Sequence, residues 1–164
     1  SATWAVMGAS SASGYIYPSL WLQERFGKGI NELDNVIQSD SYSTSIARLA
    51  SEQADIMVGF AHMQYKYADQ WTADFGREDS IWKETNIIGV TEGIFNDTVC
   101  VSKASQIMTD DFRQALGESL IEIGQSEEGL EIIDKVFAHK GYEWAEDSDY
   151  DGERKAQELI MNAD

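Results

Sequence analysis

Three short apolar runs, each followed by a segment with helical spacing, constrain the fold of this 164-residue chain most strongly. The runs "TWAVMG", "NVIQS" and "ADIMVGF" occupy residues 3–8, 35–39 and 54–60, and their lengths are typical of buried strands. Strands that alternate with helices form parallel sheets, because a crossover is needed to return the chain to the same end of the sheet. The sequence therefore predicts an α/β fold.

The segments between and after these runs have the spacing of amphipathic helices. In one of them Met63, Tyr67 and Trp71 recur every four residues and should share a helix face. After Ser102 the pattern is helical to the end, so we expect an α/β sandwich over residues 3–102 and a helical region over 103–164. The predicted helices are 14–26, 42–53, 62–75, 109–125, 126–139 and 150–161, and two further strands are predicted at 86–92 and 97–102.

Capping residues mark the expected helix ends. Thr109 or Asp110 can cap the helix that follows, and Gly141 is expected to end the helix over 126–139. Pro18 lies early in the first helix. If Ser13 is the N-cap there, Pro18 removes one intrahelical bond and the first turn should be irregular.

The charge balance excludes some partners. The chain has 12 Lys and Arg against 29 Asp and Glu, a net charge of −17, and no basic stripe that could neutralise phosphates, so nucleic acid is not an expected partner. Such acidity favours solubility and fits a salty or an extracytoplasmic setting. Cys100 is the single cysteine, and His62 and His139 have no metal-ligand spacing, so we expect neither an internal disulfide nor a metal or other cofactor.

A turn rich in small residues, "GASSASG" at residues 8–14, joins the first strand to the first helix. The first amides of a helix have no intrahelical acceptor, and the helix dipole favours negative charge there. Two interpretations stay open, a simple N-cap turn and a site for an anion. The turn has neither the lysine of a P-loop nor GxGxxG spacing, and the chain has no GxSxG, so the residues give no positive evidence for an enzyme.

Four stretches together resemble the periplasmic phosphonate/phosphate-type substrate-binding proteins of ABC transporters. They are, in order, "MGASSASGYIYPSLWL", "SDSYSTSIARLASEQADIMVGF", "GVTEGIFNDTVCVS" and "KGYEWAEDSDYDGERKAQEL". The resemblance implies a type II periplasmic-binding-protein lobe, a three-layer α/β/α sheet with C-terminal helices, and ligand held in a cleft between two lobes. It also implies a periplasmic or extracellular membrane-associated location and an ABC permease as partner.

Site residues follow from the same resemblance. An anion such as phosphonate, phosphate or phosphite would be bound at the helix start, and Asp97 would be the cleft aspartate that can accept from a ligand ammonium. Tyr42 lies where the family has a histidine, and His62 lies roughly where some members have a carboxylate. The helix-start residues are Ser11, Ala12, Ser13 and Gly14.

This chain departs from the family pattern at several positions. Ala12 lacks a hydroxyl, Tyr42 replaces histidine, and Phe95 replaces a proline, which leaves the identity of the anion open. The family has a lobe before the Ser-rich turn, so we expect most of that first lobe to be missing. Residues 3–102 would then be the second lobe, and the apolar faces of the helices over 103–164 could join a second copy in a homo-oligomer.

The leading functional hypothesis is an extracytoplasmic solute-binding component of an ABC importer. A ligand-sensing domain of the same fold, coupled to a signalling partner, is the alternative.

Overall fold

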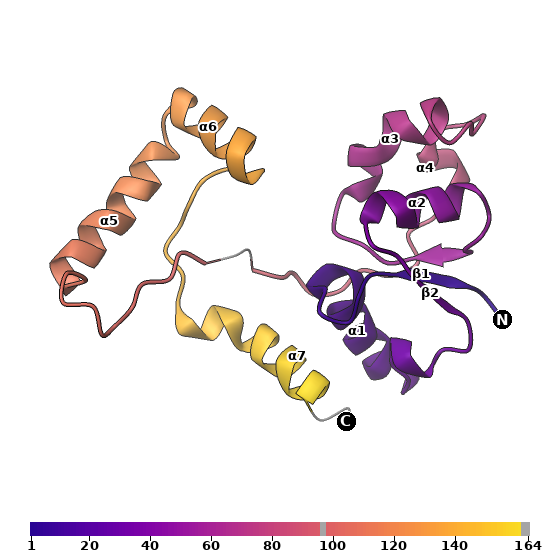
Figure 1. The fold of residues 1–164 in the computed structure, drawn as a ribbon, viewed down its shortest axis with the longest axis horizontal. Helices are drawn as coiled ribbons and strands as arrows, with labels where there is room; N and C mark the ends of the chain where they lie inside the picture. The colour runs from indigo at the N-terminus through magenta and orange to yellow at the C-terminus, as the bar shows by residue number, and fades with distance from the viewer. Residues whose placement is uncertain (96–97, 162–164) are drawn as a thin grey trace. The chain divides into compact units, whose positions relative to one another are not determined.

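The computed structural model describes residues 1–95 and 98–161 (Figure 1). The chain divides into two compact units: unit 1 comprises Ser1–Ile94 and Gly152–Asp164, and unit 2 comprises Phe95–Asp151. These bounds differ from the predicted division into 3–102 and 103–164, which concerns functional lobes and stays a prediction.

Unit 1 is built on a small parallel sheet. Its strands β1 (Trp4–Val6), β2 (Val36–Gln38) and β3 (Ile56–Met57) are ordered β2-β1-β3, with Trp4 opposite both Val36 and Ile56. All three match predicted strands and are shorter than the apolar runs. The central strand is the most enclosed, since Ala5 is 0% and Val6 is 1% exposed.

Helices cover both faces of this sheet (Figure 1). Because β2 and β3 lie on opposite sides of β1, two right-handed crossovers place α1 and α2 on opposite faces. On one face α1 (Tyr17–Phe26) packs Leu22 against Val6 and Val58. On the other face α2 (Tyr42–Ala50), α3 (Met63–Ala73) and α4 (Ile81–Glu84) form a second core cluster. The predicted α/β class is confirmed, in three layers.

The helical spacing in α3 is confirmed by its burial. Met63, Tyr67 and Trp71 are 7%, 8% and 2% exposed, and all belong to the second core cluster. Unit 1 also has two short elements that were not predicted, the 3₁₀ turn Ile30–Glu32 and the single helical turn α4. Both are too short for a periodic pattern to identify them.

The strands predicted at 86–92 and 97–102 are wrong for every residue that the structure describes there, namely 86–92 and 98–102. Ile87, Ile88, Val90 and Val99 are between 59% and 74% exposed, and no described strand pairs with these segments. An apolar, β-branched run forms a strand only where a neighbouring strand accepts its backbone hydrogen bonds. Sequence periodicity does not report whether that neighbour is present.

Unit 2 contains the helices α5 (Asp110–Ile123) and α6 (Glu127–Phe137), followed by a 3₁₀ turn at Asp147–Tyr150. Thr109 caps α5 as predicted, because its side chain accepts from the amide of Phe112. The predicted end of α6 at Gly141 is wrong: Ala138 adopts the left-handed conformation at φ 58° and ends the helix three residues earlier.

Helix α7 (Asp151–Met161) follows, and from Gly152 onward it belongs to unit 1. The Tyr17 hydroxyl donates to Glu153 Oε2 at 3.0 Å, and Ala156 is fully buried. Burial, and then this carboxylate, raise the pKa of Tyr17 to about 12. A membrane-spanning helix is not found in the part of the chain that is described.

Candidate functional site

The strands of a parallel sheet end at one common edge, and in α/β folds ligands bind at that edge where the strand order reverses. Here the order β2-β1-β3 reverses about the central strand, so the segment after β1 lies at this point. Three segments leave the edge, residues 7–16 after β1, 39–45 after β2 and 58–66 after β3. They contain every described residue that we predicted for the site.

The segment after β1 is a closed turn. The amide of Met7 donates to the carbonyl of Gly14 at 3.0 Å, and the amide of Ser11 donates to the carbonyl of Gly8 at 2.9 Å. Pro18 has no N–H to offer Gly14, four residues earlier, so that carbonyl accepts from Met7. The proline thus contributes to the closure of the turn.

Ser11 begins the helix, and Ser13 does not. Ser11 has an extended backbone (φ −80°, ψ 116°), and its hydroxyl accepts from the amide of Gly14 at 3.2 Å. A wide π-helical turn over Ala12–Ile16 then leads into α1, which is the irregular first turn that Pro18 led us to expect. A Cβ on Gly14 would lie 2.6 Å from Met7 Cβ and 2.9 Å from Ser11 Oγ, so the closed turn requires glycine there.

Two backbone amides at this helix start remain available. Ala12 and Ser13 are half-buried, and their N–H groups donate to no acceptor among residues 1–95 and 98–161. They are orphan donors of a helix N-terminus, where the helix dipole also favours negative charge. The turn can therefore offer two backbone amides and the nearby hydroxyls to an anion.

Tyr42 is brought to the same place from 31 residues away. Its hydroxyl lies 3.3 Å from Ser11 Oγ, and either group can be the donor. Ser41 caps α2 by accepting from the amide of Thr44 at 3.1 Å, which fixes Tyr42 as the first helical residue. The Tyr42 ring meets the Phe60 ring edge to face, with 5.0 Å between centroids. The sequence indicated Tyr42, but nothing in it indicated Phe60.

The other two predicted residues have different outcomes. His62 is exposed at the start of α3, with a left-handed backbone (φ 64°) and its ring 5.9 Å from that of Tyr65. His62 belongs to the segment that follows β3 at the same edge of the sheet. In the described structure, however, His62 makes no contact with Ser11 or Tyr42. Asp97 lies outside the described residues, so its place in the site stays a prediction.

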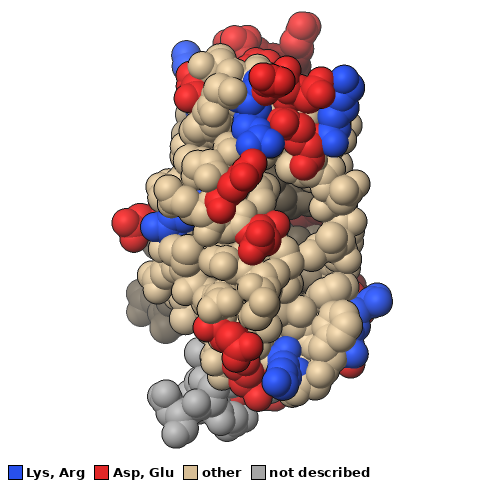
Figure 2. Space-filling model, turned by 90° about the vertical axis from the view of Figure 1, so that its right-hand side faces the viewer, with Lys and Arg blue, Asp and Glu red and all other residues tan. Residues whose placement is uncertain are grey.

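The edge segments are unusually poor in negative charge. They contain 10, 7 and 9 residues, and of these 26 only Asp40 is acidic. At the chain's average of 29 acidic residues in 164, such a set would hold between four and five. The single Lys or Arg among them is Lys66. Figure 2 draws a different side of the molecule, the one that lies at the right in Figure 1, and there basic side chains lie among acidic ones and form no stripe of their own. A local deficit of carboxylates lowers the repulsion that an arriving anion would meet.

A known protein family matches most of the chain. A family described as ABC transporter, phosphonate, periplasmic substrate-binding protein matches residues 1–150. The chain belongs to this family. No curated protein and no solved structure matched the chain significantly.

Membership of the phosphonate-binding family confirms the resemblance that the four sequence stretches indicated. It assigns the chain a solute-binding role in ABC transport, outside the cytoplasm, in a family whose members bind their ligand for transport. Within residues 1–95 and 98–161, no group of three or more His, Cys, Asp or Glu side chains could hold a metal ion.

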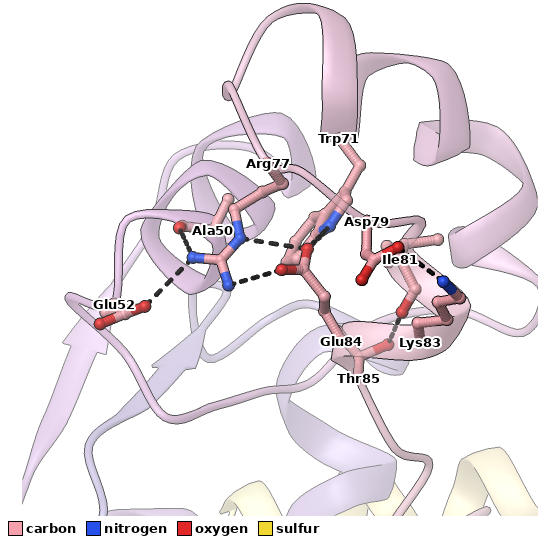
Figure 3. A network of polar contacts seen from close by, with 9 residues as sticks. All are labelled: Ala50, Glu52, Trp71, Arg77, Asp79, Ile81, Lys83, Glu84 and Thr85. Carbon is pink, nitrogen blue, oxygen red and sulfur yellow. Dashed lines mark hydrogen bonds and ion pairs between the residues drawn. The ribbon is translucent and has the colours of Figure 1, made fainter.

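A network of polar contacts around Arg77 and Glu84 in unit 1 was not predicted from the sequence (Figure 3). The Arg77 guanidinium donates to both carboxylate oxygens of Glu84, at 3.0 and 3.1 Å, and to the Ala50 carbonyl at the end of α2. The Trp71 indole donates to Glu84 at 2.6 Å. Hydrogen bonds from Arg77 and then from Trp71 hold the pKa of Glu84 below its usual value, and those to Glu84 and Glu52 raise the pKa of Arg77.

This network ties α3 and α4 to the C-terminal end of α2, the helix whose first residue is Tyr42. It joins these helices within one layer, and it makes no contact with the Ser11 turn in the described structure.

Proposed function

We propose that this chain binds a phosphonate-type anion at the start of the helical segment that follows β1, and that the whole binding protein delivers it to the permease of an ABC importer. The observation that carries the proposal is the pair of available amides, on Ala12 and Ser13, next to the hydroxyl pair of Ser11 and Tyr42. Family membership supports a phosphonate-type ligand.

Such a site needs no arginine or lysine. Backbone amides and hydroxyls form charge-assisted hydrogen bonds to an oxyanion, and these bonds are shorter and stronger than neutral ones. The three oxygens of a phosphonate can accept from two amides and from the hydroxyls of Ser11 and Ser13. The same donors fit phosphate or phosphite, so the donor set indicates a phosphorus oxyanion without choosing among the three.

The two-lobed fold, the further ligand contacts and the permease partner are proposed from family membership alone. A type II fold would hold the ligand between two lobes, with Gly14 allowing close approach of the backbone, with Asp97 as the cleft aspartate and with His62 as a further ligand contact. These assignments, and the permease as partner, are part of the proposal. The charge-poor edge supports the anionic ligand, because approaching groups meet Asp40 as the only carboxylate of the three segments.

The decisive variant is Ala12→Pro. Ala12 is the first residue of the helical turn, where proline is well tolerated, and Ser11 already has the extended backbone that a following proline requires. The substitution therefore removes one available amide without breaking a hydrogen bond. We expect calorimetric titration with methylphosphonate, phosphate and phosphite to show binding to the unaltered chain and a roughly tenfold loss in the variant.

Ala12→Ser is the matched control, because it keeps the amide and adds a hydroxyl at the same position. We expect it to bind as tightly as the unaltered chain or more tightly. Equal affinity of Ala12→Pro and the unaltered chain for all three anions would contradict the proposed helix-start site. Absence of binding by the unaltered chain would contradict the proposal that this chain binds the anion.

A further inference from the structure

Tyr42 is held at three points, and each of them belongs to a different segment of the sheet edge. Its backbone is fixed at the first position of α2 by the cap of Ser41. Its hydroxyl lies 3.3 Å from Ser11 Oγ, on the segment after β1. Its ring meets the Phe60 ring, on the segment after β3, at an interplanar angle of 82°. An aromatic pair in this edge-to-face geometry contributes more than the burial of its surface.

The segment after β3 also approaches the Tyr42 ring through its backbone. A Cβ on Gly59 would lie 3.6 Å from Tyr42 Cδ1, so Gly59 and Phe60 together border the ring. Phe60 is half-buried and packs, like Tyr42, against the second core cluster. A tyrosine side chain without such neighbours exchanges between staggered rotamers. The packing against Phe60 therefore favours the rotamer whose hydroxyl reaches Ser11.

The Ser11 hydroxyl has one proton and two lone pairs, and its contacts limit where that proton can go. One lone pair accepts from the amide of Gly14 at 3.2 Å. When the Tyr42 hydroxyl donates to the other lone pair, the Ser11 proton is left for a ligand. A phenol is a stronger acid than an aliphatic hydroxyl and is therefore the better donor of the two. An oxyanion that accepts from Ser11 favours the same direction of the bond.

We propose that Phe60 and Tyr42 form a positioning pair for the anion site. Phe60 holds the Tyr42 ring, the Tyr42 hydroxyl donates to Ser11 Oγ, and the Ser11 proton is thereby directed to the bound anion. The pair rests on the proposed function, because the anion lies at the Ser11 turn. Both residues act on the ligand through Ser11, and the sequence did not indicate Phe60.

A double-mutant cycle with methylphosphonate as the probe tests this pair. The probe is titrated calorimetrically into the unaltered chain, Tyr42→Phe, Phe60→Leu and the double variant, and thermal unfolding measures the stability of each chain. Phe75→Leu is the matched control. Phe75 is also half-buried and packs against the second core cluster. It follows the C-terminal end of α3, however, and makes no ring contact in the described part of the chain.

We expect Tyr42→Phe to weaken methylphosphonate binding about fivefold, which is the effect of one hydrogen bond. Phe60→Leu should weaken binding about threefold through loss of the aromatic pair, and Phe60→Tyr should retain most of the affinity because it keeps the ring. The double variant should lose about fivefold rather than about fifteenfold, because Phe60 has no effect once the Tyr42 hydroxyl is gone. Phe75→Leu should lower the unfolding temperature as Phe60→Leu does and change the affinity by less than about twofold.

Three results would overturn the positioning pair and leave the helix-start amides intact: unchanged affinity in Tyr42→Phe, additive losses in the double variant, or equal losses in Phe60→Leu and Phe75→Leu. The first would show that Ser11 needs no partner, the second that Phe60 acts independently of Tyr42, and the third that only the stability of unit 1 matters. The Ala12→Pro titration tests the amides separately. Absence of methylphosphonate binding by the unaltered chain would refute both the proposed function and the pair.

Discussion

Units 1 and 2 both contain helices with apolar side chains along one face, yet the two units bury these side chains very differently. Unit 1 has two core clusters, one on each face of its sheet. In unit 2, Ile133 at 3% exposure is the single buried large hydrophobic residue among those described, whereas Phe112, Val136 and Phe137 are about half exposed or more. The difference shows that an apolar helix face becomes a core only where a second layer covers it.

The sharpest way to test this difference is a pair of tryptophan truncations. Trp71→Ala should lower the free energy of unfolding of unit 1 by about 3–5 kcal/mol, because Trp71 is 2% exposed and its indole also donates to Glu84. Trp144→Ala in unit 2 should cost less than about 1 kcal/mol, because Trp144 is 55% exposed. Urea unfolding followed by circular dichroism measures both.

Equal losses from the two truncations would show that unit 2 is as well packed as unit 1. That result would contradict the inference that unit 1 has a packed hydrophobic core and unit 2 does not.

A smaller effect is expected from the acid sensitivity of the Arg77–Glu84 pair. The pKa of Glu84 is lower in the folded chain than its unfolded value of about 4.3, so its contribution is complete above that pH and is lost as the pH falls through the folded pKa. Thermal unfolding between neutral pH and pH 3 should therefore show a steeper loss of stability for the unaltered chain than for Glu84→Gln.

Asp79→Asn is the matched control for this pH experiment. Asp79 pairs with Lys83 through side chains that are both more than half exposed, so its removal should leave the acid dependence nearly unchanged. The same slope in Glu84→Gln and in the unaltered chain would show that the network of Figure 3 does not stabilise unit 1.

The smallest expected change in stability concerns α7, the C-terminal helix that packs in unit 1. Tyr17→Phe removes the hydrogen bond to Glu153 and should cost about 0.5–1.5 kcal/mol at neutral pH. The pKa of Tyr17 is raised to about 12, so its contribution is complete below pH ~10 and disappears as the pH rises toward 12. Urea unfolding of the two chains at pH 8 and pH 11 measures this convergence.

If the two chains differ by the same amount at pH 8 and pH 11, the hydroxyl does not hold α7 on α1. Hydrogen exchange of the α7 amides gives a second measurement, since their protection should fall in Tyr17→Phe and stay unchanged in Tyr15→Phe.

The sequence determined the order of the three strands and of the helices α1, α2, α3 and α7 in unit 1, and the reason is local. Short apolar runs and four-residue spacing, as in Met63, Tyr67 and Trp71, reflect which side chains face a core, and such a face repeats along one element. The Ser-rich turn was identified in the same way, because small residues before an apolar helix indicate capping. Four ordered motifs were sufficient to identify the family.

The tertiary structure decided what depends on residues far apart in the chain. The Ser11–Tyr42 and Tyr42–Phe60 contacts form because three strands end at one edge, and no pattern within a single segment encodes that meeting. The apolar segments 86–92 and 98–102 have the composition of strands and remain irregular, because a strand exists only through its partner. The sequence thus sets which secondary structure each segment favours. Whether the segment forms that structure depends on the elements that pack against it.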